Sequence, residues 1–153
     1  MFRPSETEKI KEKVRKFFSF LDVDSPIKFE EINSDTIKIS FWVEEAPFFI
    51  GERGETLVET QNLIKKILAK ETGRHLFIDL DINNYKEKKA KYLEDLARTA
   101  ADQAALTKKP QALKPMWAWE RRIIHSALAE RQDVYSQSSG RGHQRHIVIY
   151  PAS

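Results

Sequence analysis

Three basic side chains near residue 121 have the types and the spacing to hold an anion. Arg121 and His125 are four residues apart, which places them on one face of a helix, and Arg122 adjoins them. A guanidinium beside an imidazole offers several hydrogen-bond donors and a flat stacking surface, which suits phosphate and unpaired bases. The pattern is therefore suited to contact with single-stranded nucleic acid. By spacing alone, a solvated arginine beside a partly packed histidine is the favoured interpretation.

The turn Gly51-Glu52-Arg53-Gly54 is a second candidate for binding phosphate. Glycine lets the backbone approach a phosphate with no Cβ in the way, and the N–H groups of the turn and of the helix after it attract anions. The charges of Glu52 and Arg53 cancel, so Glu52 either repels a phosphate or points away from it. An ordinary turn between two helices has the same glycine spacing.

Catalytic chemistry finds little support in this sequence. The chain has 153 residues and no Cys, which rules out disulfides, thiolate metal sites and a Cys nucleophile. Ser126 follows His125 directly, and neighbours on a helix do not face each other. The stretch Gly51–Thr56 lacks the Gly-Lys-Ser/Thr ending of a nucleotide-binding loop. We expect no enzymatic activity, no catalytic residue, no cofactor and no small-molecule substrate.

Two places were weighed as metal sites and set aside. His143 and His146 lie three residues apart, but the tail around them contains no carboxylate, so a basic, solvated loop is the better interpretation. Asp79 and Asp81 alternate on one face of a predicted strand and have the oxygen ligands for a divalent ion. More simply, they form the polar face of an edge strand and pair with Lys86, Lys88 or Lys89. We expect no metal.

The charge of the chain is unevenly distributed. The net charge is +3, but residues 1–83 carry −3 and residues 84–153 carry +6. A length of 153 residues allows two small domains, and the basic half would favour a polyanion. No run approaches the roughly 18 apolar residues of a membrane span, so we expect a protein that is not integral to a membrane, with the cytoplasm as its default compartment.

The first half of the chain predicts the order α-β-β-α-α-β. Ser5 and Glu8 have the spacing of a capping box at the start of a first helix. Strict alternation predicts a strand over 36–43, after a shorter one at 27–32, and another strand over 75–82. A short helix at 46–50 and a longer one from residue 55 lie on either side of the Gly-x-x-Gly turn.

The second half predicts two helices and a small sheet. A long helix runs from 85 to about 106, and its inward side chains are predicted to be Tyr92, Leu93, Leu96, Ala100 and Ala104. A short strand at 111–114 and a helix over about 118–130 follow. The segments 134–138 and 145–150 form the arms of a final hairpin.

The first half resembles a type II KH domain. The resemblance is carried by Phe49–Leu57, which contains the Gly-x-x-Gly turn, by the apolar stretch after it and by the order of elements. In that family the loop clamps the backbone of about four nucleotides beside an apolar groove. The resemblance implies that Gly51, Arg53 and Gly54 hold phosphate, with Ile50 and Leu57 supporting the groove. On this interpretation Gly54→Asp should weaken binding and leave the fold nearly intact.

The second half resembles an R3H domain, a family associated with single-stranded nucleic acid. The resemblance rests on Arg121-x-x-x-His125 after a long helix and before two strands, and it implies that Arg145 lies near that pair. One departure is Met116-Trp117-Ala118-Trp119, where family members often have Met-Asn-Pro-Tyr. Trp117 and Trp119 then either stack on bases or pack in the protein interior.

A type II KH domain followed by R3H is the arrangement of the bacterial Jag family, also called SpoIIIJ-associated proteins. The resemblance implies an α+β protein with a KH domain at 1–83 and an R3H domain, with a three-stranded sheet, at 84–153. It also implies a non-catalytic regulator of cell-envelope or sporulation processes. Such a protein binds single-stranded RNA, or single-stranded DNA. Its implied protein partners are a small stand-alone KH protein and a membrane insertase.

Two other functions remain open at this stage. The chain is an adaptor between proteins if its KH half has lost RNA binding, as Glu52 and the net −3 of residues 1–83 allow. An RNA-processing enzyme is a weaker alternative. Binding to short single-stranded RNA that weakens steeply with salt would separate the nucleic-acid hypothesis from both.

Overall fold

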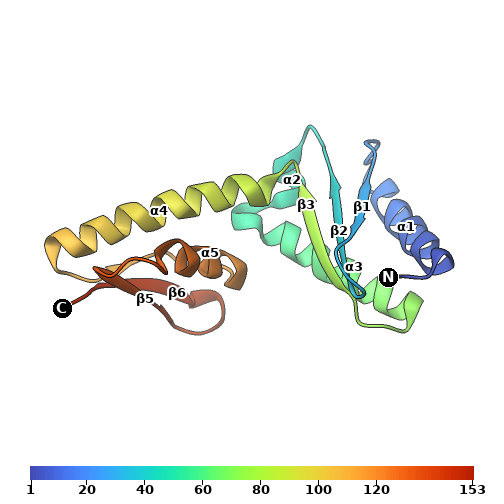
Figure 1. Cartoon of the computed structure of the whole chain (residues 1–153). Helices are drawn as coiled ribbons and strands as arrows, with labels where there is room; N and C mark the ends of the chain where they lie inside the picture. Colours follow the sequence, from blue (N-terminus) through green and yellow to red (C-terminus); the bar gives the residue numbers. More distant parts are fainter. The chain divides into compact units, whose positions relative to one another are not determined.

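The computed structural model describes residues 1–153 and divides into two compact units (Figure 1). Unit 1 spans Met1–Lys86 and unit 2 spans Glu87–Ser153. The functional boundary after residue 83, between a KH and an R3H domain, stays a proposal. Each unit has its own apolar core, so each is described by itself.

Unit 1 has the predicted order of elements, α-β-β-α-α-β, with the Gly-x-x-Gly turn between its second and third helices. The turn forms a single 3₁₀ turn, Glu52–Gly54. The helices and strands of unit 1 are α1 (Pro4–Ser19), β1 (Lys28–Glu31), β2 (Thr36–Phe41), α2 (Ala46–Ile50), α3 (Glu55–Thr72) and β3 (Phe77–Ile82).

The sheet of unit 1 has the order β1-β2-β3, with β1 antiparallel and β3 parallel to the central strand β2. A parallel pair needs a crossover connection, and α2 and α3 supply it. The sheet buries one face, as the alternation predicts, and that face packs with α1 and α3. Its strand residues are Ile37, Ile39, Phe41, Ile78, Leu80 and Ile82.

The predicted capping box at the start of α1 is wrong. The helix begins at Pro4, its N-cap is Arg3, and no side chain caps it. Proline suits the first helical position because its fixed φ is already helical and its missing N–H would have had no partner there. Ser5 is therefore inside the first turn rather than before it.

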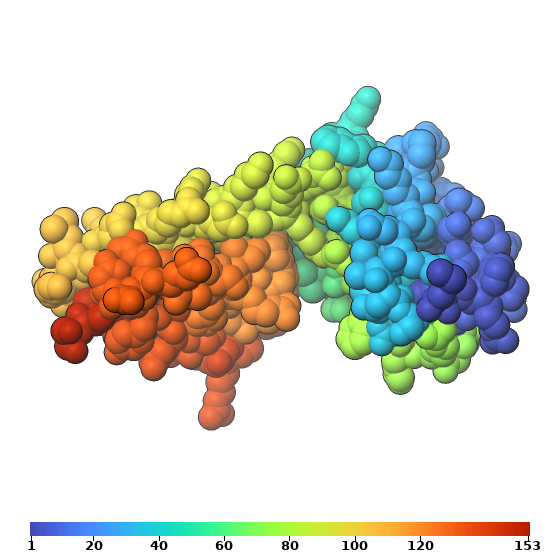
Figure 2. Space-filling model, in the orientation of Figure 1, coloured from blue at the N-terminus to red at the C-terminus, as the bar shows by residue number.

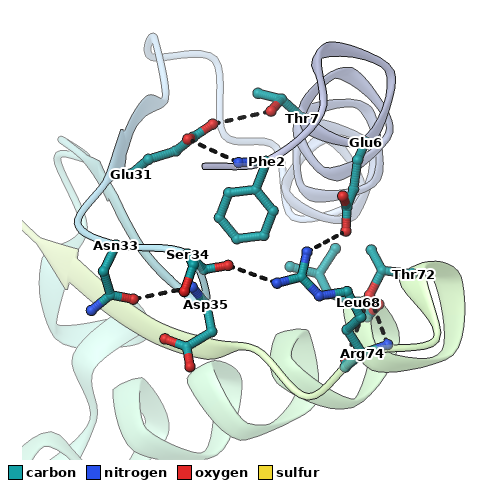
Figure 3. A network of polar contacts seen from close by, with 10 residues as sticks. All are labelled: Phe2, Glu6, Thr7, Glu31, Asn33, Ser34, Asp35, Leu68, Thr72 and Arg74. Carbon is teal, nitrogen blue, oxygen red and sulfur yellow. Dashed lines mark hydrogen bonds and ion pairs between the residues drawn. The ribbon is translucent and has the colours of Figure 1, made fainter.

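A polar network joins α1, the β1–β2 turn and Arg74, the second residue after α3 (Figure 3). The Arg74 guanidinium donates to Glu6 Oε1 at 3.0 Å and to the Ser34 carbonyl at 2.7 Å. It also lies over the ring of Phe2, 5.1 Å from its centroid. Because Arg74 follows the carboxy-terminal end of α3, this network braces the end of that helix remote from the Gly-x-x-Gly turn.

Unit 2 consists of two helices and the predicted three-stranded sheet. The sheet has the order β4-β6-β5, and both pairings are antiparallel. A 3₁₀ turn, Gly142–Gln144, interrupts the projecting β5–β6 connection (Figures 1 and 2). The elements are α4 (Tyr85–Thr107), which begins in unit 1, β4 (Gln111–Ala112), α5 (Ala118–Leu128), β5 (Val134–Ser139) and β6 (His146–Pro151).

The inner face of α4 differs from the prediction at one large residue. Tyr92 is 58% exposed, and the fully buried positions are Leu93, Ala97, Ala101 and Ala104. The burial follows a stripe of three- and four-residue steps that starts at Leu93, and Tyr92 lies one residue away around the helix. Small alanines let α4 approach the rest of the core closely. No helix of the structure is both long and apolar enough to cross a bilayer.

Candidate nucleic-acid interface

Helix α5 places Arg121 and His125 at the edge of its packed side. Ile124 and Leu128 are buried in the core of unit 2, as the spacing predicts. Arg121 and His125 are each half-buried at the edge of this packed side. The helix therefore holds a guanidinium and an imidazole next to each other on the surface.

A buried glutamate fixes the start of α5. The backbone N–H of Trp117, the N-cap residue, donates to Glu120 Oε2 at 2.8 Å. Glu120 is only 3% exposed, and Lys89 Nζ lies 3.9 Å from its other oxygen. Glu120 thus positions the first turn of α5, from which Arg121 projects.

Arg145 lies beside the same turn. The Met116 N–H donates to the Arg145 carbonyl at 3.1 Å, which ties the residue before β6 to the segment before α5. Arg121 Nη1 donates to the Met116 carbonyl at 2.7 Å, and Arg145 Nη1 donates to the Gly140 carbonyl, also at 2.7 Å. Both guanidinium groups are held by carbonyls, and neither forms an ion pair with a carboxylate.

The electrostatics of Arg121 indicate an unbalanced positive site. Burial, followed by the charges of Arg145 and Arg122, lowers the pKa of the Arg121 guanidinium, and Glu120 only partly opposes this. Arg131 in the same unit is the opposite case. It donates to Asp133 and Asp102, and these hydrogen bonds raise its pKa. An anion would relieve the repulsion at Arg121, whereas Arg131 is already neutralised.

His125 is held by strand β5. Its Nδ1 lies 2.6 Å from Ser136 Oγ, a hydrogen bond that crosses from α5 to β5. Burial and then the charge of Arg121 lower the pKa of His125 from 6.5, so the imidazole is neutral near pH 7. In the tautomer in which the Ser136 hydroxyl donates to Nδ1, the ring carries its proton on Nε2 and can donate it to a phosphate. Arg121, His125, Ser136 and Arg145 are called the basic cluster below.

The Gly-x-x-Gly turn has the backbone that only glycine adopts easily. Gly51 has φ +75° and Gly54 has φ +74°. A Cβ on Gly51 would lie 2.2 Å from Thr56 Oγ1, and a Cβ on Gly54 would lie 3.1 Å from the Tyr85 hydroxyl. Both glycines are therefore required by the fold itself. The expectation that Gly54→Asp leaves the fold nearly intact is wrong, because Gly54 is buried against Tyr85.

The two variable residues of the turn reach solvent. Glu52 and Arg53 are exposed, and Arg53 has φ +56°, an unusual value outside glycine. The Gly51 N–H donates to the Pro47 carbonyl and the Gly54 N–H to the Gly51 carbonyl, at 2.9 and 3.3 Å. These two N–H groups are thus used within the turn.

The apolar residues expected beside the turn differ in burial. Leu57 is fully buried in the core of unit 1, and Ile50 is half-buried against it. Both therefore support the turn from inside.

Comparison with known proteins shows which family has these features. The family model of the R3H domain matches residues 91–151. RNA-binding protein KhpB of Clostridium symbiosum is 32% identical over 127 residues, which cover 83% of this chain and 57% of that protein. RNA-binding protein KhpB of Bacillus subtilis is 35% identical over 116 residues, 74% of this chain and 56% of that protein. These matches show an R3H domain in this chain and a likeness to RNA-binding protein KhpB, in agreement with the resemblance to the Jag family.

The chain spans slightly more than half the length of these two relatives. RNA-binding protein KhpB of Lactiplantibacillus plantarum is also 32% identical, over 129 residues that cover 38% of its length. The resemblance drawn from the motifs is confirmed, and so are the α+β class and the three-stranded sheet of the second unit.

Two residues that position the basic cluster, Glu120 and Ser136, were missed from the sequence. Glu120 had a usable signal, since it stands three residues after the N-cap Trp117. Ser136 had none, because its pairing with His125 depends on how β5 packs against α5.

Arg122 lies apart from the basic cluster. It is exposed and lines a shallow surface depression with Glu94, Arg98 and Ser126. Its charge still acts on Arg121. Trp117, half-buried, meets the ring of His143 edge-on with centroids 6.1 Å apart, and Trp119 is half-buried as well.

The edge of the first sheet carries one more polar group of contacts. Asp79 pairs with Lys86, as the sequence predicts for this strand. Gln61 Oε1 accepts from the Leu80 N–H at 3.0 Å and from Lys86 Nζ at 3.2 Å. The lysine that follows β3 thus compensates the acidic edge of the strand, and no group of three or more potential metal ligands forms anywhere in the chain.

Proposed function

We propose that this chain is a non-catalytic protein that binds single-stranded RNA through the basic cluster of unit 2. The observation that carries the proposal is the pair Arg121 and Arg145. Each guanidinium is held by a backbone carbonyl and forms no ion pair with a carboxylate, and the charge of Arg145 acts on Arg121. A phosphate of a nucleic-acid backbone is the anion that such a pair recognises with paired hydrogen bonds.

Support for RNA as the ligand comes from the family. The curated relatives carry the name RNA-binding protein, and single-stranded RNA is the form whose bases are free to stack on protein groups. His125 adds a neutral donor to the two guanidinium groups, and Arg122 adds charge nearby.

The turn at 51–54 is proposed as a second, weaker contact with the RNA backbone. Arg53 is exposed there, and the positive φ of Gly51 and of the buried Gly54 shapes the turn that presents it, with Ile50 half-buried behind. Glu52 offsets the charge of Arg53. The turn therefore selects the backbone geometry of a single RNA strand more than it attracts the RNA by charge. Two weak contacts on one chain raise each other's effective concentration, which gives useful avidity.

The wider role follows the family resemblance. We propose that the protein acts in the cytoplasm as a post-transcriptional regulator tied to cell-envelope or sporulation processes. Its proposed protein partners are a small stand-alone KH protein and a membrane insertase.

Binding of a fluorescently labelled oligouridine of about 12 nucleotides tests the proposal. Loss of a charged contact with phosphate costs about 1.5–3 kcal/mol, so Arg121→Ala should weaken binding by roughly tenfold or more. Lys91→Ala is the matched control, because it removes one positive charge from an exposed position of α4 in the same unit. Anisotropy titrations at low salt give the affinities, and circular dichroism confirms the fold of each variant. Equal losses in both variants would reject the basic cluster as the site.

A specific surface of unit 1 favours the adaptor as second candidate. A groove of about 790 Å³ lies between the end of α1 and the projecting segment before α2 (Figure 2). Phe20 and Phe48 in it are 77% and 69% exposed. Four acidic residues also line it, so it repels phosphate and suits an amphipathic protein helix with basic flanks. These acidic residues are Asp22, Asp24, Glu44 and Glu45.

A pair of synthetic helical peptides separates this candidate from RNA binding. A leucine and lysine peptide should bind the wild-type chain, and a leucine and glutamate peptide should not. Phe48→Ser should abolish that binding and leave oligouridine affinity unchanged. Equal binding of the lysine peptide to wild type and Phe48→Ser would remove the groove from consideration.

A further inference from the structure

The sheet of unit 2 has one packed face and one open face. Val134, Ile147 and Ile149 point into the core with α4 and α5. The residues that alternate with these core residues along β5 and β6 belong to the other face, because successive side chains of a strand point to opposite faces. None of them belongs to the core: on β5 they are Tyr135, Gln137 and Ser139, and on β6 His146, Val148 and Tyr150.

Two tyrosines are stacked on the open face. Tyr135 and Tyr150 are cross-strand partners, and their rings are 5.2 Å apart at their centroids and 15° from parallel. Such a pair stabilises the hairpin, and that role explains their contact with each other. It does not explain why Tyr135 stays 50% exposed on an edge strand of the sheet.

The charge of this face suits nucleic acid. The three strands of the sheet contain no Asp or Glu. His146 lies on the open face, and Lys114, two residues beyond Ala112 of β4, is exposed. The nearest acidic residue along the chain, Asp133, is occupied by Arg131. A base would therefore meet an aromatic ring in surroundings that do not repel its phosphate.

The geometry of β5 links this face to the basic cluster. β5 is an edge strand, since the sheet has the order β4-β6-β5. Ser136 bonds to His125 on one side of the strand, and Tyr135, the residue before it, projects to the other. A single strand whose phosphate lies at Arg121 and His125 can thus pass over this edge and place a base on Tyr135.

We propose that the open face of β5 and β6 is a base-stacking site for single-stranded RNA, with the Tyr135 ring as its platform. The inference rests on the proposed RNA binding and adds the site at which a base, rather than a phosphate, is held. Aromatic rings bind bases of any sequence in this way, so the site contributes affinity with little sequence preference.

Three variants at one position test the site with the same oligouridine. Loss of one stacked base should weaken binding by about 5- to 100-fold in Tyr135→Ala. Tyr135→Phe keeps the ring and should bind like wild type. Tyr135→Leu keeps apolar contact with Tyr150 on the strand and should bind like Tyr135→Ala. Tyr92→Ala, at an exposed tyrosine on α4, is the matched control and should change nothing.

Salt and abasic RNA distinguish stacking from charge. Tyr135→Ala should leave the salt dependence of binding unchanged, because no phosphate contact is lost, whereas Arg121→Ala should reduce it. An oligonucleotide of abasic sugar-phosphate units should bind wild type and Tyr135→Ala equally. If wild type binds oligouridine and Tyr135→Ala binds it equally well, the stacking site is overturned and the basic cluster stands. If wild type does not bind at all, the proposed function is overturned as well.

Discussion

Arginines in unit 2 take two roles that the sequence alone does not separate. Arg131 lies between Asp102 and Asp133 and joins α4 to the segment before β5. Arg121 and Arg145 are held by carbonyls instead, and their charges remain available. The spacing of Arg121 and His125 correctly predicts that they are neighbours, because residues four positions apart on a helix lie on the same face. The contribution of Ser136 depends on tertiary packing, which no local pattern reports.

The titration of His125 gives a prediction with a definite sign. Its pKa lies below 6.5 in the free protein, so the ring is neutral at pH 7. Bound phosphate favours the imidazolium, and RNA affinity should therefore rise as the pH falls from about 7 to 5.5. Affinity titrations over this range measure the effect. His125→Gln keeps a hydrogen-bond donor without the titration and should lose most of the rise. An equal rise in that variant would assign it to another histidine.

The lowered pKa of His125 also means that the free energy of unfolding should decrease as the pH falls, whereas RNA affinity should increase. Since the folded pKa of His125 lies below the unfolded value, the unfolded chain binds the proton more readily. The contribution of His125 to the free energy of unfolding is therefore present above about pH 6.5 and is lost as the pH falls through the folded pKa. The wild type should lose more stability than His125→Gln between about pH 7 and 5.5, measured by denaturant titration.

At the scale of elements, the Gly-x-x-Gly turn is set by packing within unit 1. The two strands with strict alternation were predictable from their pattern, because one buried face imposes a period of two. The start of α1 was not, since proline at the first helical position competes with a capping box one residue later. The role of Gly54 was also hidden, because Tyr85 lies 31 residues away in the sequence and contacts it only in the fold.

Substitution of the first glycine tests this account of the turn. Gly51→Ala places a Cβ 2.2 Å from Thr56 Oγ1 and forces φ +75° on alanine. We expect it to lower the free energy of unfolding by about 2–3 kcal/mol. Gly73→Ala is the matched control, with φ +70° and nothing within 4 Å, and should cost about 1 kcal/mol. Equal losses in a denaturant titration would show that Thr56 simply moves aside.

In the molecule as a whole, the net charge of the first half is negative and that of the second half is positive, and each unit has its own apolar core. The acidic first half holds the Gly-x-x-Gly turn and the aromatic groove, and the basic second half holds the basic cluster. This uneven distribution of charge could be predicted from the sequence, because charged residues can be counted without knowledge of the fold. Under the proposed function, the main electrostatic contact with RNA lies in unit 2, and unit 1 contributes strand geometry or binds a protein partner.

The salt dependence of RNA binding by the full chain tests the central claim most directly. Each phosphate neutralised on a single strand contributes about 0.7 to the slope of log affinity against log salt concentration. We predict that Arg121→Ala with Arg145→Ala reduces this slope by about 1.4 between about 50 and 200 mM salt, while Lys91→Ala leaves it unchanged. An unchanged slope in the double variant, or no binding by wild type at low salt, would contradict the account.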